Sequence, residues 1–301
     1  MLAPAGEDAQ ALAQLFWVML AGAVALWLLV NGAFLFVTRI RPRPISRALA
    51  EGLIVGGGVV FPVIVLAALL SWGLMAMPDM RAPGDALRVH VGGEQWWWRV
   101  AYETPEGEVV SANEVRLPTG ARSEIVLTAD DVIHSFWVPA LGGKTDMIPG
   151  RVNRMSLAPT EPGVYRGQCA EFCGLSHAEM ALEAVVMEPD AFAAWLAAEG
   201  RPARPPESAA ARLGAEVFRE EGCGACHAIR GTEARGRVGP DLTHVGSRVS
   251  LGAGILPNEP AAVARWIAAA DLVKPGVRMP SYPHIPEDRL AALVAYLGSL
   301  E

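Results

Sequence analysis

Two long apolar segments stand at the start of the chain. Residues 9–38 contain no charged side chain over 30 positions, and residues 52–78 contain none over 27. Each exceeds the roughly 20 residues with which an α-helix crosses the core of a bilayer. The pattern therefore predicts a two-helix transmembrane hairpin in residues 1–80, with spans at about residues 11–37 and 53–77. A signal peptide fits the first segment poorly, because no basic residues precede it and the apolar run is too long.

The charges beside these segments predict the orientation of the hairpin. Glu7 and Asp8 precede the first span, and no basic residue accompanies them. Four arginines lie between the spans: Arg39, Arg41, Arg43 and Arg47. Because short basic loops stay in the cytoplasm, we expect both chain termini on the outer side of the membrane, which in a bacterium is the periplasmic side of the inner membrane.

Short β-type segments separated by turn residues follow the hairpin. They are residues 87–91, 95–102, 124–128, 132–138, 151–157 and 182–187. Gly92-Gly93, Pro149-Gly150 and similar pairs mark turns between them. Strands at this spacing predict an all-β, antiparallel sandwich or barrel, and we assign it to residues 81–199.

The pattern becomes helical near the end of the chain. A short amphipathic helix is expected at residues 190–199, and residues 200–208 form a proline-rich, semi-rigid linker. Three further helices are predicted: residues 209–220, 260–270 and 287–300. Residues 209–301 therefore form a small all-α domain in this prediction.

Charge is uneven along the chain, whose net charge is −7. Residues 81–199 carry 9 basic and 17 acidic side chains, whereas residues 209–301 carry 10 of each. Phosphate binding needs clustered Lys and Arg, so nucleic acid is excluded as an expected partner. An acidic middle domain suits a basic protein partner or a cation.

Cysteine, histidine and methionine form one candidate metal site. Cys169, Cys173, His177 and Met180 follow one another at short spacing, and His134 lies in an earlier strand segment. Thiolate, thioether and imidazole ligands favour copper over hard cations, and two thiolates can bridge two copper ions. A disulfide between the cysteines and a tetrahedral zinc site are the alternatives, but zinc leaves Met180 unexplained.

The other two cysteines indicate a haem. Cys223-Gly-Ala-Cys226-His227 matches the C-x-x-C-H signature of covalent c-type haem attachment, with the histidine as proximal ligand. Met279, on a Pro/Gly-rich loop, is our candidate for the sixth ligand, as electron carriers need a closed site. His244 and His284 are its rivals.

Three motifs together resemble subunit II of the haem-copper oxidases. They are residues 131–139, residues 144–151 and the run Gly167-Gln-Cys-Ala-Glu-Phe-Cys-Gly-Leu-Ser-His-Ala-Glu-Met180. The resemblance covers about residues 10–190 and implies a cupredoxin-like Greek-key sandwich. Gly239-Pro240 resembles the cytochrome c segment whose proline carbonyl accepts a hydrogen bond from the proximal histidine.

The resemblance also implies roles for single residues. It implies a dinuclear copper centre, CuA, with Cys169 and Cys173 bridging, His134 and Met180 on one ion, and His177 and the Glu171 carbonyl on the other. The Glu171 side chain would reach a magnesium or manganese ion at the boundary with subunit I. In the run Gln95-Trp-Trp-Trp98, Trp96 would be the residue where electrons enter, and we expect it to be exposed.

The function implied by the resemblance is electron transfer in a bacterial respiratory cytochrome c oxidase, an oxidoreductase. An external cytochrome or other one-electron donor would reduce the haem, the haem would reduce CuA, and CuA would reduce subunit I, with subunit III as a further partner. The alternatives are the electron-accepting subunit of a CuA-containing nitric oxide reductase and a membrane-anchored copper-delivery or electron-transfer protein. The sequence leaves open the donor, the haem type of subunit I, proton-pumping stoichiometry, a role for Glu51 in proton uptake, and whether Met1 is the mature N-terminus.

Overall fold

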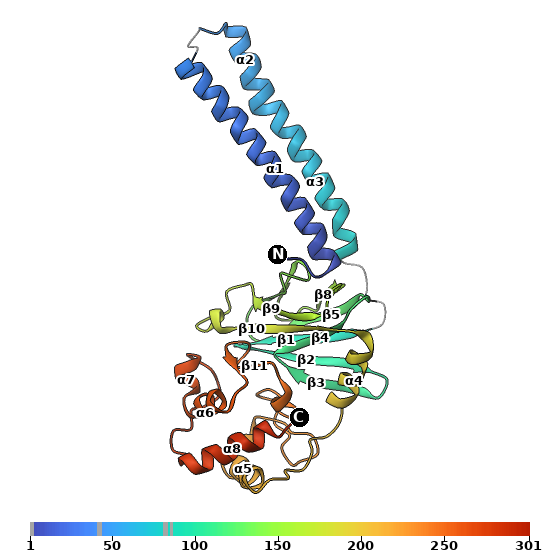
Figure 1. Ribbon diagram of the computed structural model, residues 1–301, viewed down its shortest axis with the longest axis vertical. Coiled ribbons are helices and arrows are strands. Elements are labelled where there is room, and N and C mark those ends of the chain that lie inside the picture. Colours follow the sequence, from blue (N-terminus) through green and yellow to red (C-terminus); the bar gives the residue numbers. More distant parts are fainter. Residues whose placement is uncertain (1–2, 41–43, 81–83, 85–86) are drawn as a thin grey trace.

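A computed structural model describes residues 3–40, 44–80, 84 and 87–301 of the chain. Two long helical rods project from the β domain side by side (Figure 1). The first rod is α1 (Glu7–Leu35) with a π-helical turn to Ile40. The second is α2 (Arg47–Val55), a π-helical turn (Gly56–Val60) and α3 (Phe61–Met80).

Both rods are long and apolar enough to span a membrane, over Glu7–Ile40 and Arg47–Met75, and neither is buried within the chain. The helices thus start earlier than the predicted spans, because polar first turns continue the same helix. Arg41 and Arg43 of the predicted basic loop lie outside the described residues. Glu51 accepts a 2.7 Å hydrogen bond from Arg47 on an exposed helix face.

Two five-stranded sheets pack face to face in the middle of the molecule. One has the order β3 (Gly107–Ala112), β2 (Trp97–Thr104), β1 (Arg88–Glu94), β5 (Ser123–Ala129), β8 (Asn153–Leu157). The other has the order β4 (Glu114–Pro118), β10 (Ala181–Met187), β9 (Gly163–Cys169), β6 (His134–Trp137), β7 (Lys144–Met147). The predicted sandwich is confirmed, but β1–β5 and β4–β10 pair in parallel, so the expectation of purely antiparallel pairing is wrong.

The core of the sandwich lies between the sheets and consists of large apolar side chains. Trp98, Tyr102 and Phe136 are fully buried there. The Trp98 indole packs edge-on against Phe136, and its Nε1 donates to the Ala181 carbonyl at 3.0 Å. This contact ties β2 to the start of β10, the strand that follows the metal-ligand loop.

A small helical domain follows α4 (Pro189–Glu199) and the proline-rich segment. It contains α5 (Ala209–Glu220), α6 (Pro260–Ala268), α7 (Ala270–Val273) and α8 (Glu287–Gly298), with a two-stranded ladder of β11 (Ser250–Leu251) and β12 (Leu256–Pro257). The single helix predicted over residues 260–270 is wrong, because the backbone leaves the helical region at Ala269 (φ −148°) and α7 starts anew.

The helical domain lies against the β sandwich, on the side away from the hairpin (Figure 1). Hydrogen bonds that cross between the domains fix this position: Arg166 Nη1 to Gly254 O at 2.9 Å, Ala181 N to Ala253 O at 2.9 Å, Arg99 Nη2 to Arg237 O at 2.8 Å and Arg230 Nη1 to Val110 O at 3.1 Å. The two domains therefore contact each other through specific hydrogen bonds, in addition to being linked by the connecting segment.

Candidate metal and haem sites

The residues of the candidate copper site converge from two strand ends and one loop. His134 begins β6, Cys169 ends β9, and Met180 immediately precedes β10. Because β6 and β9 are antiparallel neighbours, with Phe136 opposite Cys169, the histidine and the first cysteine reach the same end of the sheet.

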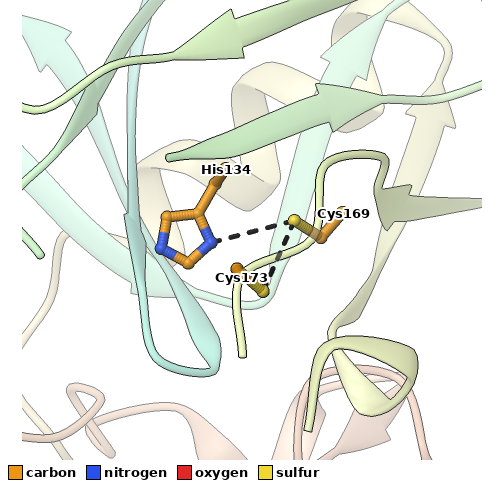
Figure 2. Close-up of side chains that lie close together, drawn as sticks. All are labelled: His134, Cys169 and Cys173. Atoms are coloured by element: carbon orange, nitrogen blue, oxygen red, sulfur yellow. Dashed lines mark hydrogen bonds between the residues drawn. The ribbon is translucent and has the colours of Figure 1, made fainter. Parts of the chain in front are cut away.

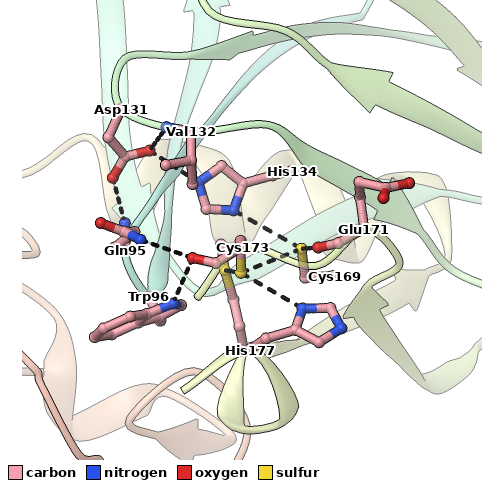
Figure 3. Close-up of polar contacts among 10 residues, drawn as sticks. Gln95, Trp96, Asp131, Val132, His134, Cys169, Glu171, Cys173 and His177 are labelled. Atoms are coloured by element: carbon pink, nitrogen blue, oxygen red, sulfur yellow. Dashed lines mark hydrogen bonds and ion pairs between the residues drawn. The ribbon is translucent and has the colours of Figure 1, made fainter. Parts of the chain in front are cut away.

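All six residues expected to ligate copper meet around the two thiols. Figure 2 shows His134 with the two cysteines, and Figure 3 adds Glu171 and His177. The distances are 3.7 Å between the two Sγ atoms, 3.8 Å from Cys169 Sγ to His134 Nδ1, 3.2 Å from Cys169 Sγ to the Glu171 carbonyl, 3.5 Å from Cys173 Sγ to His177 Nδ1 and 3.8 Å from Cys173 Sγ to Met180 Sδ. A disulfide needs sulfurs at about 2.05 Å, so the thiols are not bonded to each other here.

The donor set fits a pair of copper ions. Each thiol has its own imidazole nitrogen, and the thioether and the carbonyl oxygen add one further donor beside each thiol. A four-coordinate zinc site would leave two of these donors unused. Two copper ions that share both thiolates would use all six donors, because each ion would have one imidazole and either the thioether or the carbonyl oxygen. Soft sulfur ligands also favour copper.

One side of the site is buried, and the other side is partly exposed to solvent. His134, Cys173 and Met180 are nearly fully buried, whereas His177 is half-buried. Contacts with Cys173 and then with His134 lower the pKa of the Cys169 thiol below the usual value, although burial opposes them. The pKa of Cys173 moves the opposite way, because a second thiolate beside the first is unfavourable.

Asp131 orients His134 from behind, a role that sequence reasoning missed. Its Oδ1 lies 2.9 Å from His134 Nε2 and accepts a hydrogen bond from the backbone N–H of Val132 at 2.7 Å. Its Oδ2 accepts one from the backbone N–H of Gln95, also at 2.7 Å (Figure 3). A carboxylate on the second nitrogen fixes the ring and leaves Nδ1 facing the thiols. An acid three residues before a ligand histidine was the available signal.

Trp96 lies directly beside the candidate copper site. Its Nε1 donates to the Cys173 carbonyl at 3.0 Å, and Gln95 Nε2 donates to the same oxygen at 2.7 Å. The expectation that Trp96 is exposed is wrong: its side chain is 7% exposed. The helical domain covers it, with Gly276 packed against the indole ring.

The haem-attachment motif lines a cavity between the helical domain and the β sandwich. Cys223, Cys226, His227 and Met279 all line this cavity. His227 Nδ1 lies 2.7 Å from the Pro240 carbonyl, so the hydrogen bond expected from the resemblance is present. Burial lowers the pKa of His227, which favours the neutral ring with Nε2 left to bind iron.

The other two histidines are engaged elsewhere. His244 Nε2 lies 3.1 Å from the Arg201 carbonyl, and His284 Nε2 lies 2.9 Å from a Glu221 oxygen. Among the described residues, Met279 lines the cavity and neither of these histidines does. The geometry therefore favours Met279 over both rivals.

The cavity lining fits a haem. Most of it is apolar and comes from several elements: Val238, Leu242, Val245, Leu251, Val263 and Ile267. Two buried polar atoms on the same lining, Arg248 Nε and Ser250 Oγ, have no hydrogen-bond partner among the described residues. Such atoms suit the negatively charged propionates of a haem, because buried polar groups are rarely left unpaired.

Comparison with known proteins gives a family for each of the two domains. The family model for the periplasmic domain of cytochrome c oxidase subunit II matches residues 108–188, and the cytochrome c model matches residues 211–301. Cytochrome c oxidase subunit 2 of Bacillus subtilis is 32% identical over 253 residues, covering 81% of this chain and 70% of that protein. The chain belongs to the cytochrome c oxidase subunit 2 family.

Two other family members match a smaller share of this chain. The subunit 2 of Alkalihalophilus pseudofirmus is 40% identical over 74% of this chain, which spans 64% of that relative's length. The solved periplasmic domain of subunit II of cytochrome oxidase from Bradyrhizobium japonicum is 34% identical, with a TM-score of 0.37, covering 40% of this chain and 96% of that one. Family membership implies copper in the β sandwich, and the cytochrome c match implies haem c in the helical domain.

Proposed function

We propose that the chain is the electron-receiving subunit of a bacterial cytochrome c oxidase, with a haem that reduces a dinuclear CuA centre. One observation carries the proposal. The cavity lined by Cys223, Cys226, His227 and Met279 is also lined by Trp96, whose indole is hydrogen-bonded to the carbonyl of a candidate copper ligand.

The bound haem c and CuA would each take up and release one electron without making or breaking a bond. Cys223 and Cys226 would hold the haem covalently, and His227 and Met279 would supply its two iron ligands. A thioether opposite a histidine leaves no open position for oxygen and raises the potential. The residues thus specify an electron carrier and not an oxygen-binding site.

At the copper site, the protein positions the ligands and excludes water from them. Cys169 and Cys173 would hold both ions, and the buried His134 and Met180 would supply further ligands to one of them. His177 and the carbonyl of Glu171, on the more exposed side of the loop, would supply them to the other. We propose that this side faces subunit I, to which the electron passes, and that subunit III joins the complex.

The Glu171 carboxylate is exposed and lies 3.9 Å from Lys144 Nζ. A magnesium or manganese ion there would need further oxygen ligands from subunit I, so this part of the proposal concerns the complex. The apolar hairpin would anchor the chain with both folded domains on the outer side, where an external one-electron donor reaches the haem.

The test is spectroscopic. The full chain is produced in a bacterial periplasm that matures c-type cytochromes, purified in detergent and loaded with copper, and its optical and EPR spectra are recorded. We expect one covalent haem per chain and an EPR signal from one electron shared equally by two copper ions. A mononuclear copper spectrum in place of the shared signal contradicts the CuA assignment.

Two variants sharpen this test. Cys173→Ser removes a bridge and should abolish the shared-electron signal while leaving the haem spectrum intact. Met279→Ala should change the haem axial ligation while leaving the copper spectrum intact. If each variant altered both centres equally, the assignment of separate ligand sets would be wrong.

A further inference from the structure

Lys274 lies buried at the interface between the β sandwich and the helical domain, and the proposed function gives it no role. It follows α7, and its side chain is 1% exposed. Of 25 basic residues in the chain only two are lysines, the other being the exposed Lys144. A buried ammonium is costly unless its protons are all bonded, so its position needs a reason.

The partners of Lys274 come from both domains. Its Nζ donates to the Trp96 carbonyl of the β sandwich at 2.8 Å and to the Gly252 carbonyl of the helical domain at 2.5 Å. In the described part of the chain, no carboxylate lies within ion-pair distance of this ammonium. The contact is therefore directional, from the Lys274 amino group to two carbonyls, and it holds the Trp96 backbone rather than balancing a charge.

The loop that carries Lys274 surrounds Trp96. Gly276, with φ +79°, lies so close that an added Cβ would be 3.0 Å from Cη2 of the indole. The Pro275 carbonyl accepts a 2.6 Å hydrogen bond from Ser176 Oγ, one residue before the candidate ligand His177. Three successive residues of the helical domain thus contact Trp96 or the copper-ligand loop.

The same loop ends at the haem cavity. Lys274, Met279 and Trp96 line one cavity, and Met279 is five positions after Lys274 in the chain. On the other side, the Trp96 indole donates to the Cys173 carbonyl at 3.0 Å. Lys274 is therefore located where the haem domain, Trp96 and the copper site meet.

We propose that Lys274 is a positioning residue for electron transfer between the two centres: it fixes Trp96 against the haem domain and in contact with Cys173. This inference rests on the proposed function. In the step concerned, one electron leaves the reduced haem, whose iron becomes ferric, and reduces the copper centre by one electron. No proton moves and no bond changes, so the protein controls the rate through position.

The test compares two variants of the full, copper-loaded chain in detergent. Lys274→Met removes the ammonium and keeps an unbranched side chain of similar length. Arg166→Met is the matched control, because it removes another cation that donates across the same interface, to Gly254 O, without touching Trp96. Haem and copper spectra first establish that both centres are intact in each variant.

Two readouts follow. The rate of intramolecular transfer from haem to copper, after rapid photoreduction of the haem, should fall roughly tenfold or more in Lys274→Met, since ångström-scale displacement of a reacting group costs that much. Reduction of the haem by an external donor should not change. Before copper loading, amide hydrogen exchange in residues 95–98 should be faster in Lys274→Met than in Arg166→Met.

Each outcome has a defined meaning. A transfer rate in Lys274→Met equal to the unsubstituted rate overturns the inference, and so does an equal slowing in Arg166→Met, which would show general loosening of the domains. If the unsubstituted chain transfers no electron from haem to copper, the proposed function itself fails and the inference with it. Should Lys274→Met not fold, Gly276→Ala displaces the indole from the other side and must slow the same step.

Discussion

At the residue scale, each candidate copper histidine is useful only when its ring is held in one orientation. Asp131 does this for His134, and we predict that Asp131→Asn lowers copper affinity by about 10–100-fold, the usual cost of losing such a partner. Its exposed neighbour provides the control, since Asp130→Asn removes the same charge without the His134 contact. Copper titration with a competing chelator measures both, and equal affinities would refute the role of Asp131.

Gly239 shows how closely the backbone approaches the proximal histidine. A Cβ added there would lie 2.5 Å from His227 Cε1 and 2.9 Å from Nδ1, the nitrogen that faces the Pro240 carbonyl. We predict that Gly239→Ala displaces the ring and lowers the fraction of chains with a fully ligated, low-spin haem. Absorption spectra of purified protein measure this fraction; an unchanged spectrum would show that the ring can move without cost.

At the element scale, the helical domain depends on the close crossing of α5 and α8. A Cβ on Gly214 would lie 2.0 Å from the Ala292 carbonyl, which is backbone and cannot yield. We predict that Gly214→Ala destabilises the helical domain by about 1–3 kcal/mol, or prevents its folding, as overpacking does. Denaturation followed by haem absorbance, compared with the unsubstituted chain, measures this; an unchanged stability would show that α5 and α8 can separate without cost.

The sequence predicted elements best where one local pattern determines them. Residues 209–220 match α5 at both ends, since Ser208 caps the helix and its apolar face is regular. Strands such as β9 (Gly163–Cys169) carry glycine, arginine and glutamine, so alternation does not reveal them. The parallel pairing of β1 with β5 joins segments distant in the chain, and no local pattern encodes it.

At the scale of the whole molecule, the sequence likewise predicted one part of the candidate sites, the ligand residues, and missed another, the contacts between the domains. Ligand residues were recognisable because copper and haem impose residue types at fixed spacing, and the structure brings them together. The burial of Trp96 was not recognisable, because it results from one domain packing on another through contacts such as that of Lys274. Contacts between domains produce no periodic pattern of apolar and polar residues in the sequence of either segment.

The hairpin is joined to the sandwich by the residues that precede α1 as well as by the segment after α3. Ala5 N donates to the Ala140 carbonyl, and the Ala5 carbonyl accepts from Thr160 N, both at 2.8 Å. One turn later, the buried Asp8 accepts from Arg122 Nη1 and Nη2 at 2.9 and 3.1 Å. The first membrane helix therefore starts from a fixed point on the β domain.

We predict that Asp8→Asn destabilises this junction by about 1.5–3 kcal/mol, the range for a hydrogen bond between charged groups. Glu7→Gln is the control, because Glu7 contacts the same arginine at 3.1 Å from an exposed position and should contribute at most about 1 kcal/mol. Thermal unfolding in detergent, together with amide exchange in residues 5–9, measures both variants. The two acids share Arg122 but differ in burial and in the number of hydrogen bonds they accept from it, two for Asp8 and one for Glu7. Equal destabilisation would show that the junction depends on charge alone and not on the buried geometry of Asp8.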